Sequence, residues 1–281
     1  MRTIKEETII AAVSKMLADI NYSLSPDVCR AVAKSEHSET NPTAKKVLGK
    51  LIDNMTCAHE ENVPICQDTG MAVIFLEIGT GVRIDSPHSM QEICDIATER
   101  AYTRNFLRLS VVADPLRRVN THTNAPAVVY TELVAGDIFK ITVSPKGFGS
   151  ENMSKIKMFT PSAAEDDIIN FIVYTVFGAG SNPCPPVVVG VGIGGTFDYC
   201  AVLAKKALTI PLDVPNPDPF YAEMEQKTLD RLNTLCIGPQ GFGGDTTALA
   251  VKILPYPTHI AGLPVAVNIN CHVCRHISKE I

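Results

Sequence analysis

Three cysteines lie in turn-forming sequence outside any helical pattern. Each is surrounded by Pro, Gly or Asn: Cys66 in PICQDTG, Cys184 in SNPCPPVVV and Cys271 in VNINCHVC. Cysteine thiolates in loops can reach a metal, whereas cysteines at regular apolar spacing are packing residues. The three positions therefore predict ligands for one metal centre.

Most of the remaining cysteines follow a helical apolar pattern. Cys29, Cys94, Cys200 and Cys236 lie among Val, Leu, Ile and Ala, and Cys57 closes a similar segment. This spacing predicts side chains that pack in the interior.

Two kinds of metal centre fit the loop cysteines. A cubane bound by three thiolates leaves one iron open, and that iron can act as a Lewis acid on a carboxylate and a hydroxyl leaving group. Zinc is the alternative, because Cys271 and Cys274 form a C-x-x-C with His276 nearby. A single C-x-x-C supplies only half of a closed zinc site, so iron-sulfur chemistry explains more of the sequence, with Cys274 as a bystander.

Polar residues next to these loops have the types that a 2-hydroxy acid would need. Cations would bind carboxylates, and a base would remove a proton from carbon. The candidates are Gln67 and Asp68 directly after Cys66, Arg108, Arg117 and Arg118 after an expected helix, and Lys146 and Lys155 around KGFGS.

The run Gly190–Gly195 satisfies G-x-G-x-x-G and follows valines, with Asp213 about 20 residues further on, so dinucleotide binding is one reading. The second strand of such a site would contain Pro211, which a central parallel strand does not tolerate. We therefore expect glycines that let a strand-to-helix turn pack closely.

Composition indicates a globular protein. The 281 residues are 46% hydrophobic and 20% charged, enough for a large core. The net charge is -5, and no Lys/Arg stripe predicts nucleic-acid binding. No apolar run approaches a membrane span. Nine cysteines, an odd number, and the opening MRTIKEETII favour the reducing cytoplasm over secretion.

The pattern predicts one mixed α+β domain over residues 1–281, in which a helical N-terminal third packs on mixed β-sheets with surrounding helices and Gly/Pro-rich loops hold the cluster. A hairpin is expected where AVVYTELV and IFKITV are joined by Ala135–Asp137. Helices are expected at 9–20, from Ser25-Pro26, and at 43–55, 89–104, 164–177, 197–208 and 218–235, and strands at 71–79, 187–190, 248–254 and 265–269.

Six motifs in order resemble the α subunit of class I, iron-sulfur fumarate hydratases and the related L(+)-tartrate dehydratases. They are PICQDTG, RLSVVADPLRRVNTHTNAPA, PKGFGSENMSK, NPCPPVVVGVGIGG, IGPQGFGGDT and PVAVNINCHVCRH. The resemblance runs from about Glu7 to the C-terminus. It implies a [4Fe-4S] cluster on Cys66, Cys184 and Cys271 and reversible hydration of fumarate to (S)-malate.

The resemblance also implies roles for individual residues. Asp68 and His259 would be catalytic. Contacts to a small dicarboxylate substrate would come from Gln67, Asp68, Arg108, Gly147, Ser150, Asn152 and Lys155. In this chain KGFGSENMSK stands where relatives often read KGGGSANK.

Single-chain members carry a second domain with further catalytic residues. The resemblance therefore implies a β subunit that supplies them, in an α/β assembly expected to be a heterotetramer. Tartrate dehydratase is the alternative within this class, and a non-catalytic iron-sulfur or zinc-binding subunit is the alternative outside it.

Overall fold

The computed structural model describes residues 2–281 and divides into two compact units. Unit 1 comprises residues 2–25, 57–148 and 275–281, and unit 2 comprises residues 26–56 and 149–274. Helices and mixed sheets occur in both units, which confirms the predicted α+β class. The division into two compact units does not test whether they fold as one domain, so the single domain over residues 1–281 stays a prediction.

Unit 1 is built on a four-stranded mixed sheet whose order is β10-β5-β2-β4. Its strands are β2 (Val73–Gly79), β4 (Val128–Val134), β5 (Phe139–Val143) and β10 (Ile277–Glu280). The apolar run of β2 is almost wholly buried, as expected of a strand flanked on both sides. A separate parallel pair joins β1 (Arg2–Lys5) to β3 (Val82–Asp85).

The hairpin expected between residues 127 and 143 is wrong. β2 lies between the two runs, parallel to β4 and antiparallel to β5. The sequence around Gly136 is turn-like, but both strands pair with the more apolar β2. This buries β5, whereas β4 at the edge of the sheet stays partly exposed.

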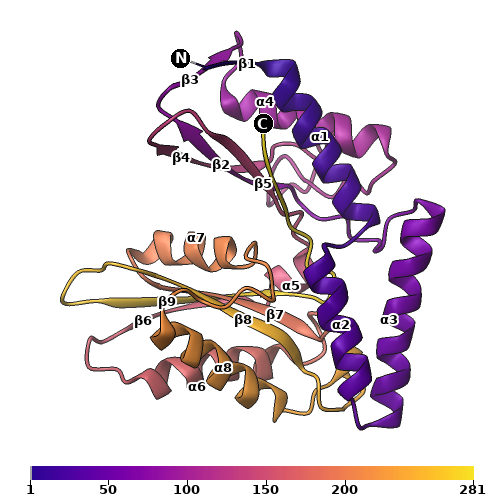
Figure 1. Ribbon diagram of the computed structural model, residues 1–281, viewed down its shortest axis with the longest axis vertical. Helices are drawn as coiled ribbons and strands as arrows, with labels where there is room; N and C mark the ends of the chain where they lie inside the picture. Colours follow the sequence, from indigo (N-terminus) through magenta and orange to yellow (C-terminus); the bar gives the residue numbers. More distant parts are fainter. Residues whose placement is uncertain (1) are drawn as a thin grey trace. The chain divides into compact units, whose positions relative to one another are not determined.

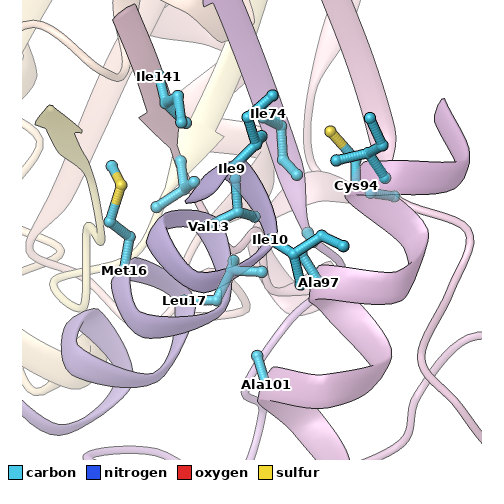
Figure 2. Packing of buried hydrophobic residues seen from close by; sticks show 14 of the residues in the cluster. Ile9, Ile10, Val13, Met16, Leu17, Ile74, Cys94, Ala97, Ala101 and Ile141 are labelled. Carbon is cyan, nitrogen blue, oxygen red and sulfur yellow. The ribbon is translucent and has the colours of Figure 1, made fainter. Parts of the chain in front are cut away.

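Two helices pack against this sheet. They are α1 (Glu6–Tyr22) and α4 (Met90–Arg104), which also pack against each other. Figure 2 shows Ile9, Val13 and Leu17 of α1 directed toward the helix that carries Cys94 and toward Ile74 and Ile141. α4 begins with a capping box in which Ser89 and Glu92 each accept from the other's backbone N–H.

Unit 2 is built on a second mixed sheet, with the order β6-β9-β7-β8. Its strands are β6 (Lys155–Phe159), β7 (Val187–Gly194), β8 (Ala248–Tyr256) and β9 (Leu263–Asn270). In Figure 1, α7 (Phe197–Ala207) covers one face, and α6 (Glu165–Ala179) and α8 (Pro219–Asn233) cover the other. The apolar core between α6, α8 and the sheet contains alternate residues of β7, namely Val187, Val189, Val191 and Ile193.

The glycines of β7 allow α7 to approach the strand closely. A Cβ on Gly190 would lie 2.2 Å from the Ala204 carbonyl oxygen, and one on Gly192 would lie 2.0 Å from the Cys200 carbonyl oxygen. The close-packing interpretation is therefore confirmed for these two residues, although they lie within the strand instead of in the turn after it.

Unit 2 also contains α2 (Pro26–Ser38) and most of α3 (Pro42–Glu61). α2 begins at the predicted Ser25-Pro26 pair, but the Ser25 hydroxyl makes no hydrogen bond. Both Glu39 carboxylate oxygens accept from the backbone N–H of Asp245, at 2.9 and 3.0 Å. Glu39, directly after α2, thus ties this helix to a segment that is distant in the sequence.

The other predicted helices and strands are all present, with ends shifted by a few residues and β7 longer by four. Sequence reasoning missed β1, β3, β6 and β10, which are short and polar. The N-terminal third is consequently less purely helical than expected. Of the helices within residues 2–281, none is both long and apolar enough to cross a membrane.

Replacing Gly192 with Ala tests the contact between β7 and α7. The new methyl would overlap the Cys200 carbonyl, so we expect the free energy of unfolding to fall by about 1–3 kcal/mol or more, measured by urea denaturation. Gly262→Ala is the matched control, because nothing lies within 4 Å of a Cβ there. Equal stability of the two variants would contradict the close approach.

Candidate functional site

The Cys66 loop lies in unit 1 between α3 and β2 and is organised around its own backbone. The Asp68 N–H donates to the Cys66 sulfur at 3.4 Å, and the Gly70 N–H donates to Asp68 Oδ1 at 3.0 Å. The thiol also lies 3.5 Å from the Gln67 side-chain oxygen. An N–H directed at sulfur stabilises a thiolate, the form in which cysteine binds metal.

Asp68 is the centre of this loop. Its second carboxylate oxygen accepts the Phe148 N–H at 3.0 Å. A Cβ on Gly147 would lie only 2.9 Å from the same oxygen, so a side chain at residue 147 would displace the Asp68 carboxylate. The structure thus brings two predicted substrate residues, Asp68 and Gly147, into contact.

Arg275 fixes the loop from behind. It is 2% exposed, and its guanidinium donates to the Asp68 carbonyl oxygen at 2.9 Å and to the Asn21 side chain at 2.6 Å. A buried cation is stable only with such partners. Sequence reasoning assigned no role to Arg275. The one sign of it in the sequence is that a charged residue follows Val273 and Cys274 in CHVCRHIS.

Arg108 is joined to the same loop through its backbone. Its N–H donates to the Thr69 hydroxyl at 3.0 Å, and that hydroxyl donates to the Arg108 carbonyl at 3.2 Å. The buried Tyr102 hydroxyl donates to the Thr69 and Gly70 carbonyls, and burial raises the pKa of Tyr102 well above its usual range. Tyr102 is therefore a permanent donor, and the Arg108 side chain remains exposed.

The other two loop cysteines come together in unit 2. Cys184 precedes β7 and Cys271 follows β9, and the antiparallel register sets Val188 opposite Asn270. The His272 N–H contacts the Cys184 carbonyl oxygen at 3.5 Å, and the His272 Nδ1 lies 3.0 Å from it. Both thiols therefore belong to one end of this sheet.

The backbone of Cys184 is strained. Its φ is 53°, in the left-handed region that costs a non-glycine residue on the order of 1–3 kcal/mol. Gln240 lies in the 3-10 helix η1 (Pro239–Gly241) and also has a positive φ, of 55°. Its side chain fixes the turn after Cys184, because it donates to the Pro185 carbonyl at 2.8 Å and lies 3.2 Å from His272 Nδ1. Strain of this kind is typical of functional turns. The motif GPQGFGG is recognisable in the sequence, but no role for Gln240 follows from it.

The glycine-rich turn after Gly147 lies at the same end of unit 2. It contains the short helix α5 (Phe148–Glu151), and it lies beside the Cys184 loop, where Asn182 contacts the Met153 sulfur at 3.8 Å. Ser150 is buried, whereas Asn152 and Lys155 are exposed.

A polar network holds this turn against β9 and α7. Lys205 forms an ion pair with Glu151, and Asn268 donates to Glu151 at 2.7 Å and to Ser154 at 2.9 Å. The same side chains line a cavity of about 210 Å³ together with Lys155. Lys155 thus lies at this polar network on β6, opposite Val267 of β9, the strand that Cys271 follows.

His259 is not brought to these cysteines. It lies in the exposed turn between β8 and β9, where its ring nitrogen accepts from Ala261. The eight residues of β9 separate this turn from Cys271, on the order of 25 Å along an extended strand. Closeness in sequence does not become closeness in space, and a catalytic role for His259 stays a prediction.

The remaining cysteines divide by burial. Cys94, Cys200 and Cys274 are buried, and burial raises the pKa of the Cys94 thiol to about 12, which makes it inert at neutral pH. Cys236 is exposed at a turn after α8, so its predicted interior position is wrong: the helical apolar pattern continues past the end of the helix. Cys57 is exposed as well, so its predicted interior position is also wrong, and Cys29 is half-buried.

The donor types in the loops fit an iron-sulfur cluster, which is held by cysteine thiolates. Cys66, Cys184 and Cys271 retain solvent exposure, as ligands to an added group require. Between residues 2 and 281, the structure contains no group of three or more His, Cys, Asp or Glu side chains arranged around a single metal ion. Cys274 instead packs against Asn270 and Leu208.

A family model described as fumarate hydratase (Fumerase) matches residues 10–280, which include all three loop cysteines and the turn at 147–155. The chain belongs to the fumarate hydratase (Fumerase) family. The resemblance found in the sequence is confirmed.

Curated relatives of this fumarate hydratase family member carry subunit names. One, from Methanocaldococcus jannaschii, is named "Putative L(+)-tartrate dehydratase subunit alpha"; it is 39% identical over 275 residues, covering 96% of each chain. The L(+)-tartrate dehydratase subunit alpha of Escherichia coli K12 is 31% identical over 267 residues, covering 94% of this chain and 87% of the relative. The similarity thus extends through both units.

Replacing Asp68 with Asn tests how the loop is held. An amide has one acceptor oxygen instead of two, so the N–H of Gly70 or Phe148 loses its partner. We expect a loss of about 1.5–3 kcal/mol in stability and faster hydrogen exchange at these two amides, measured by NMR or mass spectrometry. Asp85→Asn, at an exposed position of unit 1, should change neither; unchanged exchange in Asp68→Asn would show that the carboxylate does not order the loop.

Proposed function

We propose that this member of the fumarate hydratase family is the α subunit of an iron-sulfur hydro-lyase that reversibly hydrates fumarate to (S)-malate. The family match over residues 10–280 carries the reaction class. The geometry supports it, because Gln67 and Asp68 contact the Cys66 thiol and the Cys184 and Cys271 loops lie side by side.

We further propose that Cys66, Cys184 and Cys271 hold a [4Fe-4S] cluster. Their loop positions, the N–H directed at Cys66 and the pairing of the Cys184 and Cys271 loops support this ligand set. When bound, the cluster would supply a Lewis-acidic iron for the hydroxyl and carboxylate of the substrate. A cytoplasmic location is part of the proposal, because such thiolates need a reducing compartment.

The substrate would be bound by residues of this chain. Arg108 and Lys155 are exposed cations suited to its carboxylates, and Gln67 and Asn152 offer amide groups. Asp68, fixed by two backbone N–H groups, would hold or accept a proton, and Gly147 lets its carboxylate come close to the backbone. Ser150 would shape the turn from its buried position. His259 is left out of this set, since β9 separates it from Cys271.

A second subunit completes the proposal. The relatives named above are alpha subunits, so we infer that this chain works with a β subunit that provides the remaining catalytic groups. The two would form a heterotetramer.

L(+)-tartrate is the second candidate substrate, because several relatives are named tartrate dehydratases. Anaerobic assays of the complex of this chain with its coexpressed β subunit would separate the two. We expect kcat/KM for (S)-malate to exceed that for L(+)-tartrate by about 100-fold, the order of discrimination that one added hydroxyl permits. The reverse preference would assign the tartrate reaction, and turnover of neither substrate would leave only a metal-binding role.

Serine substitutions test the cluster ligands. Cys66→Ser, Cys184→Ser and Cys271→Ser should each lower iron and sulfide from about four atoms per chain to near zero after anaerobic reconstitution, with loss of the broad absorption near 400 nm. Each variant removes one of only three thiolates.

Cys274→Ser and Cys29→Ser are the matched controls and should keep the cluster. If Cys274→Ser also lost it, the wrong thiol would have been assigned in CHVC. Stoichiometric zinc without sulfide in the wild-type chain would overturn the iron-sulfur proposal.

A further inference from the structure

The segment between α4 and β4 has no helix or regular strand, yet its conformation is closely fixed. The Asn124 side chain accepts from the Ser110 N–H at 2.7 Å and donates to the Gly70 carbonyl at 3.1 Å. Further out, the Ala113 N–H donates to the Val119 carbonyl at 2.7 Å and closes a small loop. We call residues 113–119 the arginine loop.

Asp114 shapes the tip of the arginine loop from within. Its carboxylate accepts the backbone N–H groups of Leu116 and Arg117 at 3.0 and 2.6 Å. Arg118 has a φ of 60°, which is unfavourable for a side chain of this size. The chain therefore accepts a cost in conformational energy and entropy to hold this shape.

This ordered loop leaves its apolar side chains in solvent. Leu116 is 90% exposed and Val119 60%, and Phe106 at the base of the segment is 93% exposed. A loop that is fixed by internal hydrogen bonds but buries none of its large apolar groups is suited to bury them against another molecule.

Most of the charged residues of this segment are arginines. Arg104, Arg108, Arg117 and Arg118 all lie within residues 104–118, against Asp114 alone, although the whole chain has a net charge of -5. The Asp114 carboxylate is occupied by hydrogen bonds from the loop backbone. The surface is apolar at its tip and cationic around it, so its partner must offer an apolar pocket with acidic residues around it.

We propose that the arginine loop, with Phe106, is the docking surface for the β subunit, and that the β subunit receives Leu116 in an apolar pocket bordered by carboxylates. This rests on the proposed two-subunit enzyme. Arg108 belongs to the same segment and is tied to Thr69 in the Cys66 loop, so docking would also fix the cation proposed to bind substrate. A second subunit is favoured because the relatives are alpha subunits and because the four arginines within residues 104–118 are too few for a nucleic-acid surface.

The test is the affinity of the cluster-loaded α chain for the coexpressed and separately purified β subunit, measured by biolayer interferometry under anaerobic conditions. Leu116→Asp and the double variant Arg117→Glu/Arg118→Glu should each raise Kd by at least 10-fold. The association rate of the wild-type chain should fall as NaCl rises from 50 to 500 mM, and the double variant should lose this dependence.

Leu133→Asp is the control, because Leu133 is 72% exposed on β4 of the same unit, outside the loop. It should leave Kd unchanged. Thermal melting and iron content of each α variant exclude misfolding as the cause. An unchanged Kd in both loop variants, or equal loss in Leu133→Asp, would overturn the proposal, as would failure of wild-type α and β chains to associate.

The docking proposal and the enzymatic proposal can fail independently. Weakened association in a complex that turns over neither (S)-malate nor L(+)-tartrate would support the docking surface and refute the enzymatic proposal. Full turnover with undiminished association of the variants would do the opposite.

Discussion

The antiparallel pairing of β7 with β9 is the constraint on which the candidate site of unit 2 depends. It sets the start of one strand beside the end of the other, and so brings together two cysteines that are 87 residues apart in numbering. A register slip of one residue would turn every side chain of β9 to the opposite face. The small residues of β7 contribute to that register, because α7 can pack only where Gly190 and Gly192 leave room.

Sequence reasoning found most of the long elements and all three loop cysteines, for identifiable physical reasons. Amphipathic helices and apolar strands carry their periodicity in the chain, and cysteines among Pro, Gly and Asn differ from their packed counterparts. The order of the strands was less accessible: residues 128–143 have the local features of a hairpin, but the competing partner β2 is distant in sequence.

The sequence indicated which residues could form the candidate site, but not which residues hold its loops in place. Gln67, Asp68 and Arg108 follow from their neighbourhood, whereas Arg275 and Gln240 act on loops 207 and 55 residues away. Such long-range hydrogen bonds leave no local pattern. His259 shows the reverse case. It is twelve positions from Cys271 in the sequence but lies at the other end of β9, because each residue of an extended strand adds about 3.3 Å of length.

Both units are discontinuous in the chain, and this has a consequence for the order in which the protein is made. The Cys66 loop is synthesised early, but Arg275, which ties its backbone to Asn21, is made only after the whole of residues 149–274. During synthesis from the N-terminus, unit 1 therefore stays incomplete around Cys66 until Cys184 and Cys271 have also been made. When the ribosome has added the residue that locks the first loop, all three loop thiols have been made, so loading of the proposed cluster would fall at a late stage of biogenesis.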